Sequence, residues 1–96
     1  MNSAAYYVYI LASHRGTIYT GMTRDIAVRI DQHKSGHGGR FSSKYRTGTL
    51  VYCEVAEDLD AARERERQIK NWNRQKKINL IEVENPYRRD ISATVG

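Results

Sequence analysis

Two short runs rich in tyrosine and β-branched residues, close together near the N-terminus, constrain the fold of this chain most strongly. Residues 6–12 read Tyr-Tyr-Val-Tyr-Ile-Leu-Ala, and residues 17–21 read Thr-Ile-Tyr-Thr-Gly. The four residues between them, Ser-His-Arg-Gly, are suited to a turn, so the two runs predict an antiparallel β-hairpin. Alternation along the first strand places Tyr7 and Tyr9 on one face and Val8 on the other.

The rest of the chain predicts one more strand and three helices. The expected elements are a strand over residues 49–55 and helices over residues 24–35, 59–71 and 74–84. Thr23 and Asp58 are suited to cap the first two of these helices, and Asp25 falls in the first turn. Gly36 can end the first helix and Pro86 the last, since proline disfavours helical backbone in the residue before it.

The element order β-β-α-β-α-α predicts an α+β fold, in which a small three-stranded antiparallel sheet is flanked by helices. We expect one domain over residues 1–96, with a core over about residues 6–87 and loose termini before Tyr6 and after about Arg89. The hydrophobic content of 40% and the charged content of 28% are those of an ordinary globular chain and argue against wholesale disorder.

The sequence shows no sign of a membrane or secretory segment. The N-terminus lacks a charged stretch followed by an apolar one, and no run approaches about 18 apolar residues. Cys53 is the single cysteine. It cannot form an internal disulfide, so we expect it to pack as a small buried hydrophobe. These features predict a soluble, cytoplasmic protein with no membrane partner.

The net charge of +5 and its placement favour a polyanionic partner. The segment from Lys34 to Arg46 holds four basic residues and no acid, and residues 63–77 hold seven basic residues against two glutamates. Such a basic surface indicates nucleic acid, although a solvated helix face has the same composition. The expected nucleic-acid contacts are Lys34, Arg40, Lys44, Tyr45, Arg46, Lys70 and Arg74. Tyr45 lies among basic and hydroxyl side chains, where it could stack on a base.

A second group of residues has the spacing of a chemical site. Arg29 follows Tyr19 by ten residues, and His33 follows Arg29 by four, on the same face of the expected helix. Taken singly, Tyr9 and Tyr19 fit packing positions, and Arg29 and His33 fit a solvated helix. Glu66 fits packing worst, because it falls within an otherwise apolar stripe at helical spacing. A carboxylate there is costly to bury unless it is paired or bound to a cation.

The order and spacing of these five residues resemble the GIY-YIG endonuclease superfamily. Tyr9, in Tyr-Val-Tyr, matches the tyrosine of the first motif, and Tyr19, in Ile-Tyr-Thr-Gly, matches that of the second. Arg29 and His33 match the arginine and histidine of the family's first helix. Glu66 matches the metal-binding glutamate of its later helix. Five positions in order at matching spacing make the resemblance specific.

The resemblance covers about residues 6–87 and is nearest to the small stand-alone bacterial branch of the family, the YhbQ-like or UPF0213-like proteins. Two positions depart from the wider family. Tyr7 stands where the first motif has glycine, and Met22 stands where some relatives carry a lysine. Many relatives also place an asparagine after the glutamate, for which Asn79 is the nearer candidate and Asn73 the poorer one.

The resemblance implies a metal-dependent endonuclease that hydrolyses phosphodiester bonds in DNA with low sequence specificity, in repair or recombination. Glu66 would hold one Mg²⁺ or Mn²⁺ together with waters and phosphate oxygens. Glu64 competes for that role, but it lies two residues away and faces elsewhere on the helix. Arg29 would present its planar donor fork to a phosphate. No small-molecule cofactor is expected.

One of the two tyrosines is implied to be the general base. A phenol, with an ordinary pKa of about 10, needs a nearby metal or cation to accept this role at neutral pH. We favour Tyr19 as the base and Tyr9 as the group that orients water, and the reverse assignment stays open. His33 would share the proton or hold a phosphate.

Two non-catalytic alternatives remain at this stage. The first is a nucleic-acid-binding module on the same fold, which grips DNA or RNA through its basic helices without cutting. The second is a protein-interaction domain whose basic surface meets an acidic partner. The presence of all five chemical positions favours the nuclease.

Overall fold

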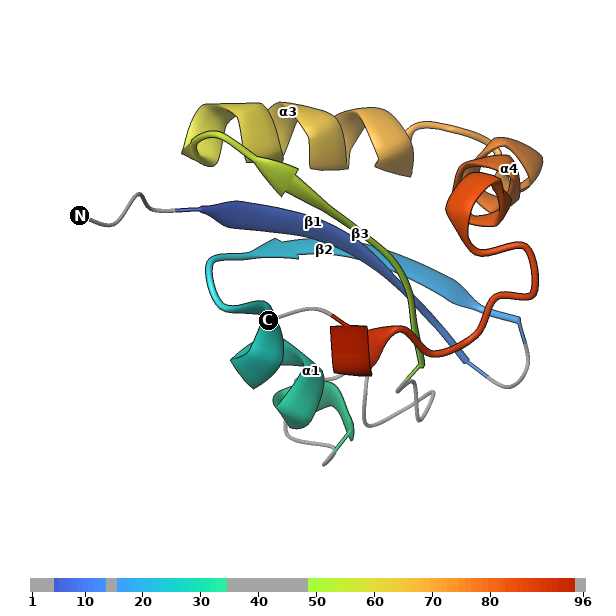
Figure 1. The fold of residues 1–96 in the computed structure, drawn as a ribbon. Helices are drawn as coiled ribbons and strands as arrows, with labels where there is room; N and C mark the ends of the chain where they lie inside the picture. The colour runs from blue at the N-terminus through green and yellow to red at the C-terminus, as the bar shows by residue number, and fades with distance from the viewer. Residues whose placement is uncertain (1–4, 14–15, 35–48, 95–96) are drawn as a thin grey trace.

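The computed structural model describes residues 5–13, 16–34 and 49–94. Its elements are β1 (Tyr6–Ala12), β2 (Ile18–Thr23), α1 (Ile26–Lys34), β3 (Thr49–Ala56), α3 (Leu59–Lys70), α4 (Arg74–Glu84) and the short 3₁₀ helix η1 (Ser92–Thr94). The three strands form one antiparallel sheet in the order β2-β1-β3 (Figure 1). The predicted α+β fold with a three-stranded antiparallel sheet flanked by helices is confirmed. Within the described ranges, no helix has the length and apolar character needed to cross a membrane.

The expected hairpin joins β1 to β2. Tyr9 pairs with Gly21 and Ala12 with Ile18 across the two strands. At the turn, the Ser13 amide donates to the Thr17 carbonyl at 3.0 Å. Gly16 closes the turn with φ of +85°, a backbone conformation that glycine adopts without steric cost. β2 continues to Thr23, beyond the predicted end at residue 21.

The central strand β1 separates two buried clusters. Val8 and Ile10 face α3 and α4, whereas Tyr9 and Leu11 face α1, as strand alternation predicts. Figure 1 shows α3 above the sheet and α1 below it. The side chains that complete the two clusters are Ala62, Ile69 and Ile81 on the first face and Ile26, Ile30 and Leu50 on the second.

A register shift in the β1–β3 pairing was not predicted. Ile10 pairs with Tyr52, but the next residue of β1, Leu11, pairs with Leu50, so Val51 is an extra residue in β3. The shift lets Val51 and Tyr52, although adjacent in the chain, both pack on the face covered by α3 and α4.

The helix caps agree with the sequence at α3 and differ from it at α1. The Ala61 amide donates to the Asp58 carboxylate at 2.8 Å, as expected for the N-cap of α3. At α1, Thr23 was expected to cap. Instead the Val28 amide donates to the Asp25 carboxylate at 3.1 Å. The Thr23 hydroxyl accepts from the Asp25 amide at 3.1 Å and donates to the Asp25 carbonyl at 3.3 Å. Asp25 therefore takes the capping position and α1 begins at residue 26. The predicted end of α1 at Gly36 lies outside the described residues.

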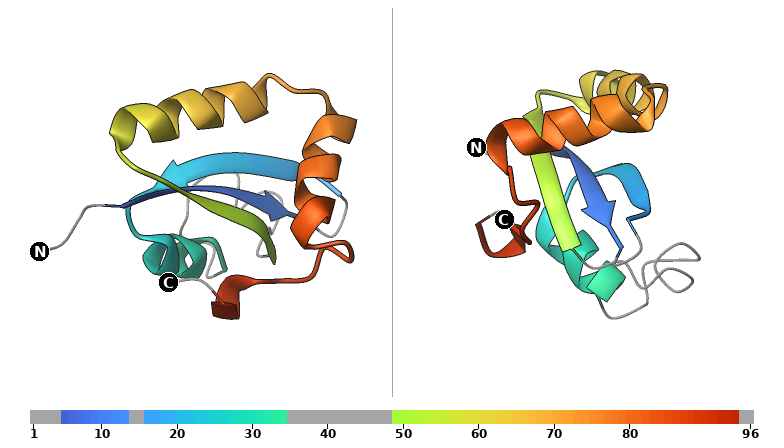
Figure 2. Two further views of the ribbon diagram at one scale, coloured as in Figure 1. Left: turned by 45° about the horizontal axis from the view of Figure 1, so that its top comes forward. Right: turned by 90° about the vertical axis from the view of Figure 1, so that its right-hand side faces the viewer.

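The segment after α4 packs against β3, where the sequence predicted a loose tail after about Arg89. The Asn85 side-chain amide donates to the Val51 carbonyl at 3.0 Å and to the Arg89 carbonyl at 2.9 Å. The Ile91 amide then donates to the Leu50 carbonyl at 2.8 Å, and its side chain joins the cluster under α1. Figure 2 shows this segment running from α4 past β3. The packed part of the domain therefore extends at least to residue 94.

Replacing Asn85 with alanine is expected to lower the free energy of unfolding by about 1–3 kcal/mol, because it leaves the Val51 carbonyl without its partner. Urea denaturation followed by circular dichroism measures the change. Asn79→Ala is the matched control. It removes an exposed amide whose side-chain oxygen accepts from Gln75, so a change within about 0.5 kcal/mol is expected. Equal losses in the two variants would contradict a clamping role for Asn85.

Candidate active site

Tyr9 and Tyr19 meet over Gly21 at the edge of the sheet formed by β2. Tyr9 pairs with Gly21 across the strands, and Tyr19 precedes Gly21 by two residues, so all three share one face. A Cβ on Gly21 would lie 2.6 Å from the Tyr9 hydroxyl and 3.0 Å from the Tyr19 ring. The tyrosine rings are tilted by 52° with their centroids 6.3 Å apart. Glycine at this position therefore makes room for the paired phenols.

The Tyr9 phenol interacts electrostatically with three other predicted site residues, Tyr19, Arg29 and Glu66. The Tyr9 side chain is buried, with 1% of its surface exposed. Burial raises the pKa of Tyr9 most, and Tyr19 and Glu66 raise it further, whereas Arg29 lowers it. A side-chain hydrogen bond with Tyr19 also favours the protonated form of Tyr9. Charges from β2, α1 and α3 thus act on a single hydroxyl of β1.

Glu66, not Glu64, turns toward this group. The Glu66 side chain is 21% exposed, and its carboxylate contacts the Lys70 ammonium at 3.1 Å. Glu64 is 64% exposed and pairs with Arg67 on the outer side of α3. Ala62 and Ile69, which share the stripe with Glu66, are fully buried. The geometry therefore supports Glu66 over its competitor.

Comparison with known proteins decides which family this arrangement represents. Residues 5–79 match the family model described as the GIY-YIG catalytic domain. The chain belongs to the GIY-YIG family. This family is one of nucleases, which generally use divalent metals and act on nucleic acids.

The GIY-YIG domain of this chain is similar to UPF0213 proteins of bacteria. UPF0213 proteins of Staphylococcus aureus strains Mu3 and Mu50 are 38% identical to it over 77 residues, which is 80% of this chain and 94% of the relatives. The solution NMR structure of a UPF0213 protein from Bacillus halodurans is 33% identical, with a TM-score of 0.58. That match covers 88% of this chain and 90% of the other. The predicted resemblance to the stand-alone branch is confirmed.

Four of the five predicted catalytic residues of the GIY-YIG domain are linked through one phenol, since Tyr19, Arg29 and Glu66 each act electrostatically on Tyr9. The fifth, His33, has its backbone in α1, but its side chain lies outside the described part of the structure, as does that of Lys34. Four expected nucleic-acid contacts also fall outside the described ranges: Arg40, Lys44, Tyr45 and Arg46. The roles of all these residues in catalysis and binding stay predictions.

Two further expected nucleic-acid contacts take separate positions. Lys70 forms an ion pair with Glu66, which the sequence reasoning missed although the i, i+4 spacing was there to find. Arg74 begins α4 and lies at the turn of the hairpin, where a Cβ on Gly16 would be 3.2 Å from its guanidinium. Arg74 is thus placed at the end of the sheet beyond the tyrosine pair.

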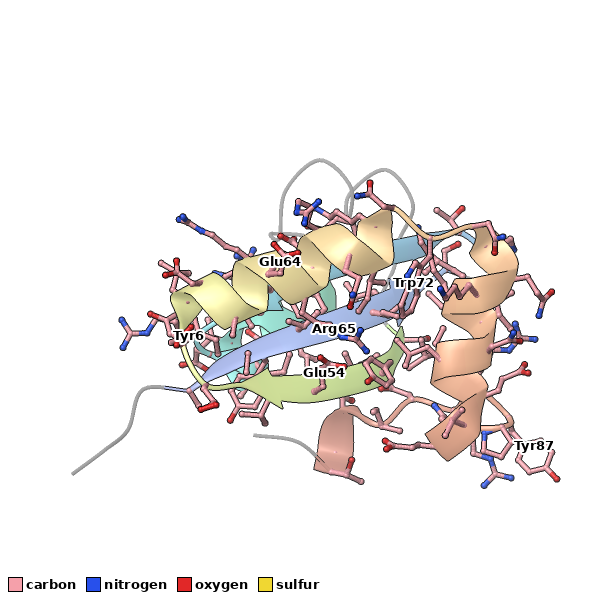
Figure 3. All side chains as sticks on the ribbon, turned by 90° about the horizontal axis from the view of Figure 1, so that it is seen from above. Tyr6, Glu54, Glu64, Arg65, Trp72 and Tyr87 are labelled. Atoms are coloured by element: carbon pink, nitrogen blue, oxygen red, sulfur yellow. The ribbon has the colours of Figure 1, made fainter. Side chains whose placement is uncertain are left out.

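A polar network holds α3 in the orientation that presents Glu66. The Arg65 guanidinium donates to the Glu54 carboxylate at 2.8 Å, and the Tyr52 hydroxyl donates to the other oxygen at 2.5 Å. Figure 3 shows Arg65 and Glu54 side by side between α3 and β3. Burial, with the bond to Glu54, raises the pKa of Tyr52 to about 12, so its proton stays in place at neutral pH. Because Arg65 precedes Glu66, this contact limits rotation of α3.

Trp72 and Cys53 take structural positions. Trp72 packs half-buried against the core under α3 and α4, and the charged ends of Arg65 and Lys76 lie over its ring at 5.3 and 4.8 Å from the centroid. The half-buried position of Trp72 against the core supports a packing role. Cys53 is half-buried rather than fully buried, and burial raises the pKa of its thiol to about 11. The thiol therefore stays protonated and unreactive at neutral pH.

Proposed function

We propose that the protein is a metal-dependent endonuclease that hydrolyses phosphodiester bonds in DNA with low sequence specificity, in repair or recombination. The observation that carries the proposal is the convergence of Tyr19, Arg29 and Glu66 on the Tyr9 phenol. These residues come from four separate elements, so their meeting is a property of the tertiary fold. A buried phenol whose pKa is shifted by burial and by specific charged neighbours is a candidate for a chemical site.

Arg29 and the two tyrosines have different tasks in this proposal. The guanidinium of Arg29 binds non-bridging phosphate oxygens and stabilises the charge that develops on them. Tyr19, which is half-buried, accepts the proton of the attacking water. Tyr9 is 1% exposed, and its raised pKa keeps its proton on. Its hydrogen bond with Tyr19 orients the base.

Glu66 is the residue that would hold the metal. Among the described residues, no group of three or more acidic, histidine or cysteine side chains could enclose an ion. A single carboxylate that leaves the other coordination positions of the ion free suits Mg²⁺ or Mn²⁺. These ions keep several waters and take the remaining ligands from substrate phosphates. When bound, the ion would neutralise charge on the phosphate under attack.

The ion pair between Glu66 and Lys70 is the observation that favours the non-catalytic alternative, a nucleic-acid-binding module on the same fold. Lys70 contacts one carboxylate oxygen of Glu66 and so competes with a metal ion. The pair is partly exposed, and such pairs contribute at most about 1 kcal/mol. A divalent ion held jointly with a phosphate can displace an ammonium bound this weakly.

An assay on labelled single-stranded, duplex and branched DNA tests the proposal. Cleavage is expected with Mg²⁺ or Mn²⁺ and none with EDTA. At saturating DNA, Lys70→Met should lower the Mg²⁺ concentration that gives half-maximal rate by about two- to five-fold. This factor corresponds to the free energy that a partly exposed ion pair contributes. Lys77→Met removes the same charge from α4 and should leave that concentration unchanged. Binding without cleavage of any substrate would establish the non-catalytic module.

Exchanging the two tyrosines for phenylalanine separates their roles. Tyr19→Phe removes the proposed base and keeps the ring, so turnover should fall about 10²- to 10⁴-fold with little change in DNA affinity. Tyr9→Phe removes the orienting hydroxyl and should cost less. Single-turnover rates across neutral to alkaline pH measure both effects. A Tyr9→Phe variant that is the more damaged of the two would reverse the assignment of the base.

A further inference from the structure

A pocket lies at the hairpin end of the sheet, on the face covered by α4. Its volume is about 350 Å³. Its lining includes the apolar residues Ile18, Val51 and Ile81 and, for the polar part, Arg74, Arg88 and Tyr87. No carboxylate lines it among the described residues, so the pocket favours an anion.

Gly16, which has no side chain, leaves room beside the guanidinium of Arg74 in this pocket. A Cβ on Gly16 would stand 3.2 Å from a terminal nitrogen of Arg74, closer than the two groups could comfortably pack. Within the described residues, no carboxylate lies within ion-pair distance of Arg74. A guanidinium with this access and without an acidic neighbour is suited to bind phosphate.

Arg88 is held at the pocket by a strained turn. Its φ of 51° places a non-glycine residue in the left-handed region, which is uncommon. Asn85 stabilises the turn by clamping it to β3 through the Val51 carbonyl. Glu82 lies 3.6 Å from Arg88 in an exposed ion pair, which is too weak to neutralise the guanidinium. Strain that the surrounding contacts support in this way often marks a binding site.

Tyr87 supplies an aromatic surface at the rim. Its side chain is 78% exposed, and it lies just beyond the end of α4 (Figure 3). The guanidinium of Arg89 lies over the ring, 5.4 Å from the centroid. An exposed tyrosine beside two arginines is the arrangement by which proteins bind a base and its phosphate together.

We propose that this pocket binds one nucleotide of an unpaired nucleic-acid strand, with its phosphate against Arg74 and Arg88 and its base on Tyr87. A volume of about 350 Å³ can hold one nucleotide, while a duplex keeps its bases stacked and cannot place one there. Ile18 lines the pocket and the next residue, Tyr19, belongs to the candidate active site. A strand cut at that site can therefore reach the pocket by passing around β2. This step rests on the proposed function, and it predicts a preference for substrates with an unpaired flank.

Binding measured without metal tests this pocket separately from cleavage. Fluorescence anisotropy in EDTA compares a labelled single strand with a duplex of the same length. Tyr87→Leu should weaken single-strand binding about 5- to 100-fold, the usual effect of losing one base stack, and change duplex binding less than about two-fold. Tyr87→Phe keeps the ring and should bind as the wild type does. Because Tyr87 is exposed, neither change should disturb folding, which circular dichroism verifies.

The arginines are tested by the salt dependence of single-strand binding. Arg74→Gln and Arg88→Asn should each reduce the slope of log affinity against log salt by about 0.7, the value for one phosphate contact on a single strand. Asparagine is chosen at position 88 because it tolerates left-handed backbone. Arg24→Gln removes the same charge at the other end of the hairpin and should leave the ratio of single-strand to duplex affinity unchanged.

Two results would overturn the proposal that this pocket binds a nucleotide. One is an unchanged ratio of single-strand to duplex affinity in Tyr87→Leu. The other is an equal loss of that ratio in Arg24→Gln and Arg88→Asn, which would show a diffuse charge effect. Either result leaves an acidic protein segment as the occupant to consider. The binding measurements are made without metal, so their outcome does not depend on cleavage. Absence of nuclease activity would therefore count against the proposed function and not against the nucleotide site.

Discussion

Replacing Glu66 with glutamine is expected to abolish metal-dependent cleavage while preserving DNA binding. Glutamine has the same shape but lacks the charge that a divalent ion needs, and Glu66 is the carboxylate whose charge acts on the Tyr9 phenol. The rate should fall by at least about 10³-fold, the upper range for losing one group that stabilises charge at a reacting centre. Removing a negative charge from a basic surface should leave DNA affinity equal or higher.

Glu64→Gln is the matched control for this result. It makes the same change two residues away on the outer side of α3, where the carboxylate is 64% exposed. Its rate should stay within about two-fold of wild type, since exposed ion pairs contribute little. Calorimetric titration with Mn²⁺ in the presence of uncleavable DNA reads metal binding directly. Near-normal cleavage by Glu66→Gln would move the metal site to Glu64 or elsewhere.

Replacing Arg29 with alanine should lower the single-turnover rate by about 10²- to 10³-fold, because its guanidinium acts on charge that develops during the reaction. Arg29→Lys should recover only part of the rate, since a point charge lacks the planar donor fork. DNA affinity should change far less, as many basic side chains share phosphate binding. Rates at saturating DNA, measured beside equilibrium binding, separate the two effects.

Arg67→Ala controls for the loss of one positive charge. Arg67 is an exposed residue of α3 that pairs with Glu64 on the outer side of the helix. Its removal should weaken DNA binding slightly and leave turnover of the bound substrate unchanged. A fully active Arg29→Lys variant would mean that charge alone suffices, and an active Arg29→Ala variant would remove Arg29 from the site.

Short-range patterns in the sequence determined most of the secondary structure. Strand alternation places Tyr9 on one face and Val8 on the other, and Asp58 caps α3 three residues before the amide that it binds. Such patterns depend on a few neighbouring residues, so they can be read without the fold. The exception is α1, where Thr23 and Asp25 both suit a cap. The choice of Asp25 depends on which oxygen reaches the amide of residue 28.

Contacts between distant segments were decided only by the tertiary structure. The shift between Ile10 and Leu11 in β1, the ion pair between Arg65 and Glu54 and the docking of Ile91 beside Leu50 each join residues from different elements. No local pattern specifies such pairs, because their geometry depends on how whole helices and strands pack.

The candidate site combines both kinds of information. Residue types and spacing in the sequence determined which side chains to consider: Tyr9, Tyr19, Arg29, His33 and Glu66. Helix spacing already favoured Glu66 over Glu64, and the fold is consistent with that choice. Only the fold showed that Lys70 already contacts the Glu66 carboxylate. It also placed Arg74, Tyr87 and Arg88 around one pocket. The physical reason is that spacing specifies which helix face a residue occupies, whereas packing against the sheet specifies what that face meets.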